Sequence, residues 1–542
     1  MAVTLPRPGS IGRQAGARRP AAPPFLWIPA VLVAGAVLLP VAYLIVRAAG
    51  ADEGVLPLLL SPRTFRLLLN TVLLGAAVAA TAVALAVPLA WLTVRTDLPG
   101  ASLWRVLTVL PLVFPSYVGA FALITALGPT GLLQVILHRL WGLERLPELY
   151  GFPGAWLTLS LFTYPYVLLS VRAGLAGIDP AVEEASRVLG RSPWATFRRV
   201  TLPLLRPWIG AGGLLVVLYA FSDFGAVSMM RFDSFTTAIY LQYQGSFNRS
   251  YAAVLSLVLV ALTVLVVFLE GRRGRVRYHR VGSATARLPR RVRLGRWRWP
   301  ALALPAAVVA AGVLLPVAVI AYWLVVGLRH GETILLSLPP LVNSLYAALL
   351  AALLTVAAAM PVAILSVRFR GPLPAALARL SYAGYALPGI VVALALVFFG
   401  ARYAAPLYQT LALLVFAYMV LFLPQALGPL RAALLQVSPA QEESARTLGR
   451  TARQVVWSVT IPLARRGAVA AAGLVFLTTM KELPATLLLS PIGFETLAMR
   501  VWSAATEALF ARAAVPALLL VLASSLSMGV LLSQEGLRWR DE

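Results

Sequence analysis

Two carboxylates in this sequence lie within apolar segments, where a charged side chain is costly. Asp223 follows the stretch LYAFS, and Glu482 follows LTTMK. An ionisable residue in a membrane span by default indicates a pathway, and two converging carboxylates would attract a hard cation that prefers oxygen ligands. In the structural alternative, the carboxylates would cap helix ends or bond to neighbouring loops. The residues alone leave both readings open.

Nearby side chains could complete such a site. Tyr219, Tyr164 and Tyr240 could add oxygen donors, although aromatic residues at membrane interfaces usually act as anchors. Lys481 could neutralise Glu482, but neighbours at i and i+1 do not face each other on a helix. We take as candidate pathway residues Asp223, Glu482, Tyr219 and Tyr164, and as candidate metal ligands Asp223 and Glu482.

The sequence offers no catalytic constellation. The only lysine, Lys481, does not follow a glycine-rich turn, so there is no phosphate-binding P-loop. The three histidines, His138, His279 and His330, are expected in separate loops. Cysteine is absent, which excludes disulfides and thiolate metal sites. We expect a protein that is not an enzyme and that binds no cofactor itself.

The composition indicates a membrane protein. Of the 542 residues, 60% are hydrophobic and 12% are charged, whereas soluble domains are roughly half apolar and a quarter charged. Apolar runs recur that are long enough to cross about 30 Å of hydrocarbon. We expect an all-α polytopic fold with spans at roughly 25–47, 66–94, 104–127, 154–176, 208–230, 251–269, 301–326, 341–367, 380–400, 406–430, 467–489 and 510–533.

The net charge of +26 is explained by topology and not by nucleic acid. The arginines cluster in short loops between the apolar spans, where they follow the positive-inside rule and can contact anionic lipid headgroups. This rule places both chain termini in the cytoplasm. The segment 270–300 contains eleven arginines and is expected to be a cytoplasmic linker.

The two halves of the chain are repeats. The pairs at an offset of 273 are Asn70/Asn343, Pro88/Pro361, Arg95/Arg368 and Pro115/Pro388, and those at 259 are Pro165/Pro424, Arg172/Arg431, Pro180/Pro439, Phe235/Phe494 and Thr237/Thr496. Six spans in each half make the repeats parallel, which predicts a pathway between the halves. The expected divisions are a tail at 1–24, halves at 25–269 and 301–533, the linker at 270–300, and a tail at 534–542.

Each half carries a similar basic loop, at 178–207 and 437–466, on the predicted cytoplasmic side. Asp179 and Ser438 are expected to cap a short helix that ends at a glycine. A second short helix should stop near the Leu-Pro or Ile-Pro pair. The loops form compact projections suited to a two-fold partner. The shared or notable positions are Glu183, Glu184, Ala185, Leu189, Gly190, Arg191 and Pro203, and Glu442, Glu443, Ala445, Leu448, Gly449, Arg450 and Pro462.

These loops resemble a motif of permease subunits in binding-protein-dependent ABC importers. The family pattern Glu-Ala-Ala, three residues, Gly, nine residues, Ile-x-Leu-Pro stands here as EAS…G…VTLP at 184–203 and ESA…G…VTIP at 443–462, with conservative departures. The resemblance implies a type I (MetI-like) permease fold whose loops couple to two copies of an ATP-binding subunit. It also implies an extracytoplasmic substrate-binding protein, with ATP and Mg²⁺ bound by the partner subunit.

The stretches DFGA at 223–226 and KELPATLLL at 481–489 resemble the fused permeases of the iron(III) importer family. This resemblance implies ferric iron as cargo and a bacterial inner-membrane location. Fused thiamine permeases share the architecture and are the alternative. A secondary transporter is the rival class, but inverted repeats would favour it and these repeats are parallel. A membrane enzyme is a weaker alternative, since no catalytic constellation is present.

Overall fold

The computed structural model describes residues 23–50, 57, 59–129, 131–142, 147–245, 250–273, 292–331, 338–369 and 371–540. Within them the chain forms helices and turns, and the only extended pairing is an isolated bridge between Thr96 and Val292. The all-α fold class is confirmed. Residues 1–22 of the expected tail at 1–24 and residues 274–291 of the expected linker lie outside the described residues, so the predicted domain limits stay a prediction.

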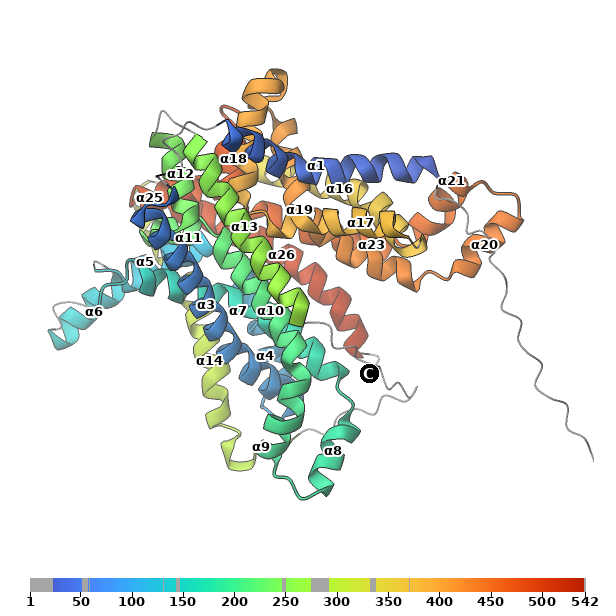
Figure 1. Cartoon of the computed structure of the whole chain (residues 1–542). Helices are drawn as coiled ribbons and strands as arrows, with labels where there is room; N and C mark the ends of the chain where they lie inside the picture. The colour runs from blue at the N-terminus through green and yellow to red at the C-terminus, as the bar shows by residue number, and fades with distance from the viewer. Residues whose placement is uncertain are drawn as a thin grey trace, which may run out of the picture.

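The helices of the first half contain most of the apolar sequence (Figure 1). They are α1 (Pro24–Ala49), α3 (Pro62–Arg95), α4 (Ala101–Leu107), α5 (Ser116–Leu127), α6 (Leu132–Trp141), α7 (Phe152–Gly177), α8 (Pro180–Val188), α9 (Pro193–Thr196), α10 (Leu202–Ser222), α11 (Gly225–Met229), α12 (Phe235–Gly245) and α13 (Ser250–Arg273).

The second half repeats this order. Its helices are α14 (Ala303–Val309), α15 (Leu315–Arg329), α16 (Leu338–Arg368), α17 (Pro372–Tyr382), α18 (Gly389–Tyr403), α19 (Leu411–Gln436), α20 (Pro439–Thr447), α21 (Ala452–Val455), α22 (Ile461–Leu463), α23 (Arg465–Met480), α24 (Pro484–Leu489), α25 (Leu497–Thr506) and α26 (Phe510–Arg540). Helix α26 extends into the segment expected to be a tail from 534 onward.

Four expected spans are broken. In the described residues, nine helices are long and apolar enough to cross a bilayer, or up to eleven if each of two bent helix pairs counts as one span. The predicted continuous spans 104–127, 208–230, 380–400 and 467–489 are wrong in this respect, because each contains an interruption. The interruptions recur at matched positions in both halves.

Proline explains one pair of interruptions. Proline has no backbone N–H and drives the preceding residue out of the helical region. Accordingly, Phe114 before Pro115 has ψ 128°, and Leu387 before Pro388 has ψ 108°. Helices α5 and α18 begin directly after these prolines, and in the second half the chain bends by 103° at this point.

The first helix of each half packs against the other half. Helix α1 lies along α16, α17 and α18, and α15 packs against α5 and α26 (Figure 1). Leu44 of α1 therefore shares a hydrophobic core with the second half, while Ile320 of α15 shares one with the first half. The packed units thus exchange helices relative to the sequence repeats.

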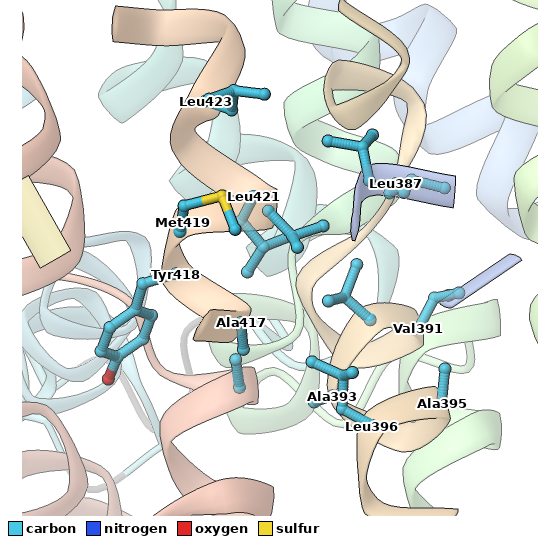
Figure 2. Close-up of a cluster of buried hydrophobic side chains, with 14 of the residues drawn as sticks. Leu387, Val391, Ala393, Ala395, Leu396, Ala417, Tyr418, Met419, Leu421 and Leu423 are labelled. Atoms are coloured by element: carbon cyan, nitrogen blue, oxygen red, sulfur yellow. The ribbon is translucent and has the colours of Figure 1, made fainter. Parts of the chain in front are cut away.

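Helices α18 and α19 form the centre of one core. Figure 2 shows their apolar side chains, among them Val391, Leu396 and Leu423, packed together, and these three are fully buried. The Tyr418 hydroxyl lies 2.7 Å from Thr486 Oγ1, which satisfies a polar group that would otherwise be costly here. This packing fixes the position of α18 next to α24.

The two halves also correspond at the start of α12 and α25, but at a different residue offset from the expected one. Thr71 Oγ1 accepts a hydrogen bond from the Phe235 amide (3.1 Å), and Ser344 Oγ accepts one from the Leu497 amide (2.8 Å). Since Thr71 and Ser344 are equivalent, Phe235 corresponds to Leu497. The expected pairs Phe235/Phe494 and Thr237/Thr496 are therefore wrong by three residues, because a longer turn precedes α25.

Two adjacent glycines in α10 provide a matched test of helix packing. A Cβ at Gly212 would lie 2.7 Å from the Val167 Cα, whereas one at Gly213 would meet nothing within 4 Å. We expect Gly212→Ala to destabilise the protein by about 1–3 kcal/mol through overpacking, and Gly213→Ala to remain within about 0.5 kcal/mol. Thermal unfolding of the purified variants measures this, and equal midpoints would contradict the α7–α10 contact.

Candidate functional site

The two basic loops are built as short helices that end at a glycine. Asp179 Oδ1 accepts a hydrogen bond from the Ala181 amide at 2.9 Å, which confirms the expected cap of α8. Ser438 occupies the same position before α20, but its side chain makes no capping bond. Gly190 (φ +80°) and Gly449 (φ +82°) follow the helices in the left-handed region, which only glycine adopts at little cost.

In the second loop, the first glutamate of the pair points inward. Glu442 Oε1 lies 2.9 Å from Arg368 Nη2 and accepts a hydrogen bond from Thr460 Oγ1 at 3.0 Å. Arg368 also donates to the Val437 carbonyl at 3.0 Å. One guanidinium at the end of α16 therefore ties the N-terminal end of α20 to the bundle.

The first loop repeats this clamp with looser geometry. Thr201 Oγ1 donates to Glu183 Oε1 at 2.8 Å, and Arg95 Nη2 is 3.8 Å from the same oxygen. Arg95 donates instead to the Leu175 carbonyl at 3.0 Å. The sequence repeat pairs Arg95 with Arg368, and the loop arginines are interpreted from sequence as determinants of membrane topology. From sequence alone, such an arginine cannot be distinguished from one that binds a loop to the bundle.

The second glutamates face outward. Glu184 and Glu443 are exposed, and so are the leucines beside the glycines, at 79% for Leu189 and 83% for Leu448. A large apolar side chain left this exposed beside charged residues is typical of an interaction surface. Among the other predicted positions, Ala185, Arg191 and Arg450 are exposed, whereas Ala445 is buried.

The second short helix does not end at Leu202–Pro203. A wide turn over Phe197–Thr201 precedes the proline, and the helix runs on unbroken from Pro193 to Ser222. This turn accommodates the backbone bond that Pro203 cannot donate. In the second half, the chain bends by 68° after Leu463, just beyond Pro462. The expected stop is therefore wrong for the first loop only.

A cavity of about 250 Å³ lies between the two halves. Asp223, Tyr219 and Tyr117 line it from the first half, and Lys481 and Glu482 from the second. The four helix interruptions meet here, because α5, α11, α18 and α24 all begin at its wall. The structure thus brings the two carboxylates to one cavity, as the repeat predicted.

Both carboxylates also cap helices. Asp223 Oδ1 accepts hydrogen bonds from the amides of Ala226 (2.9 Å) and Val227 (3.3 Å) at the start of α11. Glu482 accepts bonds from the first amides of α24 in the same way, at 3.0 Å each. The capping interpretation is therefore confirmed, whereas the pathway role of the two cavity-lining carboxylates stays a prediction.

The residue next to each carboxylate differs in size according to the length of the carboxylate side chain. The Ser116 hydroxyl donates to Asp223 Oδ2. The equivalent of Ser116 in the second half is Gly389, where a Cβ would lie 2.8 Å from Glu482 Oε1. The longer glutamate side chain occupies the room that the serine fills in the first half.

Lys481 does not neutralise its neighbour. Its ammonium group donates to the Leu112 carbonyl at 2.8 Å, across the boundary between the halves. In the part of the chain that the structure describes, Lys481 forms no ion pair with Glu482. The expectation from the i, i+1 spacing, that Lys481 and Glu482 do not pair with each other, is confirmed.

The predicted tyrosines separate into two groups. Tyr219 lines the cavity. Tyr164 does not: it is fully buried, and its hydroxyl donates to the Thr108 carbonyl at 2.5 Å. Tyr240 packs on Phe224, with ring centroids 4.7 Å apart.

Sequence reasoning missed several cavity residues, because no spacing or motif marks them. They are Tyr117, Tyr166, Tyr385 and Gln425. Among the described residues, no three His, Cys, Asp or Glu side chains form a metal-binding group. Any cation in the cavity would therefore need oxygen donors beyond the two carboxylates.

The chain belongs to the family of binding-protein-dependent transport system inner membrane components, which it matches twice, over residues 82–272 and 354–533. The double match confirms the duplicated permease. It decides against a secondary transporter, and it makes the chain an integral membrane permease of an ATP-driven importer, a family whose members are typically not enzymes. Membership implies substrate-binding and ATP-hydrolysing partners.

Individual relatives agree with this assignment. The chain is 36% identical over 520 residues to the Fe(3+)-transport system permease protein FbpB 2 of Haemophilus influenzae, covering 94% of this chain and 99% of that one. It is also 30% identical over 223 residues to the molybdenum transport system permease protein ModB of Escherichia coli, covering 39% of this chain and 96% of that one. The latter match covers less than half of this chain.

The serine and glycine beside the carboxylates predict a compensating pair of substitutions. Gly389→Ser alone should crowd Glu482 and lower transport by about tenfold, because packed interiors tolerate added atoms poorly. Gly389→Ser combined with Glu482→Asp recreates the first-half arrangement and should recover most of the activity. Uptake by reconstituted protein measures both. A double variant no better than the single one would show that the two sites are not equivalent.

Proposed function

We propose that this permease carries ferric iron into the cytoplasm of a bacterium. The observation that carries the proposal is the 36% identity, over 94% of the chain, to a permease named for Fe(3+) transport. The cavity supports it independently, because two carboxylates and only one lysine line it. Oxygen donors and a net negative charge suit a hard cation.

The size of the cavity argues against an organic cargo. At about 250 Å³ it is smaller than the roughly 300–1,000 Å³ of pockets that enclose drug-sized ligands. Thiamine is such a ligand, whereas an ion with a few oxygen ligands is not. An oxyanion such as molybdate would meet two carboxylates here, and it is therefore disfavoured by charge.

The two loops are proposed to couple the permease to two ATP-binding subunits. The exposed glutamate and leucine of each loop, Glu184 with Leu189 and Glu443 with Leu448, form the docking surface. The clamped residues Glu183 and Glu442 transmit force from the loop to the bundle. ATP and Mg²⁺ are bound by those subunits, and this chain holds no cofactor of its own.

The proposed orientation places the loops and both chain termini in the cytoplasm, with the binding protein on the opposite side of the inner membrane. Helices α3, α7 and α10 run towards α8 and α9, whereas α16, α19 and α23 run towards α20 and α21, so the halves diverge towards the loops (Figure 1). This divergence corresponds to an inward-facing state. ATP binding would draw the loops together and turn the cavity outward.

Transport by the reconstituted complex tests the cargo. Proteoliposomes with the permease, its ATP-binding subunits and its binding protein should accumulate labelled ferric iron only when ATP is supplied on the loop side. Labelled thiamine and molybdate, each tested with iron absent, should not accumulate. ATP-driven uptake of either without uptake of iron would refute the proposal.

Reversing the exposed loop charges tests the coupling. We expect Glu184→Arg with Glu443→Arg to lower transport at least about tenfold, because charge reversal at an interface creates like-charge repulsion. Folding should be retained, because both side chains are exposed. Glu507→Arg, an exposed change after α25, is the control. Wild-type transport by the double variant would exclude these glutamates from docking.

A further inference from the structure

The hydroxyl of Tyr117 is a polar group that the fold leaves unused. Tyr117 belongs to α5, is 2% exposed and lines the cavity between the halves. Among the described residues, its hydroxyl has no hydrogen-bond partner. A buried polar group without a partner is destabilising and rare, and it calls for an explanation. Because Tyr117 lines the cavity, a ligand bound there could supply the missing partner.

Tyr117 can occupy this position because the neighbouring residue, Gly225, has no side chain. A Cβ at Gly225, the first residue of α11, would lie 2.8 Å from the Tyr117 Cβ and 3.3 Å from Leu483. Only glycine allows α11, Tyr117 and the second half to meet this closely. The phenol is therefore held at the junction of the halves, between the two carboxylate-bearing breaks.

Tyr117 is one of four oxygen-bearing side chains at this cavity. Tyr117, Tyr219, Asp223 and Glu482 all line it. Tyr117 and Glu482 belong to different halves, so the four side chains meet where the halves adjoin. The group thus combines two phenols from the first half with one carboxylate from each half.

We propose that Tyr117, Tyr219, Asp223 and Glu482 form a transient binding site for the ferric ion itself, released from any organic chelator. This proposal rests on the proposed function and names the form of its cargo. Both phenols and both carboxylates supply hard oxygen donors, which trivalent iron prefers. Tyrosine is an established iron ligand in haem proteins. On coordination, each phenol releases its proton to water.

The available space fits an ion with a small ligand shell. One molecule of liquid water occupies about 30 Å³, and the cavity volume is about 250 Å³. The cavity therefore has room for an ion and several waters beside the protein oxygens that line it. An iron chelate of drug-like size would not fit, since its pocket would need at least about 300 Å³.

Lys481 explains why such a site would release its ion. The ammonium group lines the same cavity and is held by the Leu112 carbonyl of the other half. A fixed positive charge near the carboxylates weakens the binding of a cation, and a transport site must bind weakly enough to let its cargo leave. When the halves rock, the Lys481–Leu112 contact is one that must change.

The phenolate ligand gives a direct optical test. Iron(III) bound by a tyrosine phenolate absorbs visible light by charge transfer, whereas carboxylate-bound iron does not show this band. The full complex in nanodiscs, titrated with ferric nitrilotriacetate, should develop the band. Tyr117→Phe should weaken the band and lower iron uptake by about tenfold or more, as expected for loss of a ligand.

Tyr403→Phe is the control. Tyr403, the last residue of α18, is exposed and is not among the residues that line the cavity. This variant should keep both the band and the uptake. Thermal unfolding of both variants checks that the fold is retained, and the Tyr117→Phe protein should be at least as stable as wild type, because it loses an unpaired buried hydroxyl.

The outcomes separate the two proposals. If the wild-type complex imports iron but shows no visible band, or if Tyr117→Phe imports iron as wild type does, the tyrosine site is wrong and the importer function stands. If the wild-type complex imports no iron, both proposals fail. A weaker band and lower uptake in Tyr117→Phe, with Tyr403→Phe unchanged, support the site.

Discussion

The central constraint on this fold is that backbone groups freed inside an apolar bundle must still find hydrogen-bond partners. Lipid offers none, so an interrupted helix in a membrane protein is stable only where protein groups satisfy its ends. Asp223 and Glu482 do this for α11 and α24. Because the capping groups at these two breaks are carboxylates, they also place two acidic side chains at the interface of the halves. One interaction therefore supplies both the architecture and the charge of the site.

The two halves keep the same arrangement of broken helices, but the side chains that line the cavity differ between them. The serine and aspartate of the first half become glycine and glutamate in the second, and the total length of the side chains stays matched. Where the first half places the rings of Tyr166 and Tyr219 in contact, the second has a hydrogen-bonded pair, Thr478 and Gln425. The cavity thus has a phenolic wall and an amide wall, which a symmetric pore would not provide.

The same helices connect the cavity to the loops. From Pro193 to Ser222 the chain forms one helix of 30 residues, about 45 Å long at 1.5 Å per residue. It begins beside the exposed loop and ends at Asp223, so a displacement of the loop is transmitted along a rigid element. The second half contains a 68° bend in the equivalent element. The helical segment that connects each loop to the cavity is therefore continuous in the first half and bent in the second.

The sequence by itself determined the fold class, the parallel duplication and the two loops, because hydropathy, charge and motif spacing are local signals. It also predicted that Asp223 and Glu482 meet, since the repeat made them equivalent. Only the tertiary structure decided that helices break at Pro115 and Pro388 to face these carboxylates, that α1 packs on the opposite half, and that the Tyr117 hydroxyl has no partner within the described part of the chain. These features depend on contacts between distant segments, and apolar periodicity reports that a residue is buried without specifying its neighbour.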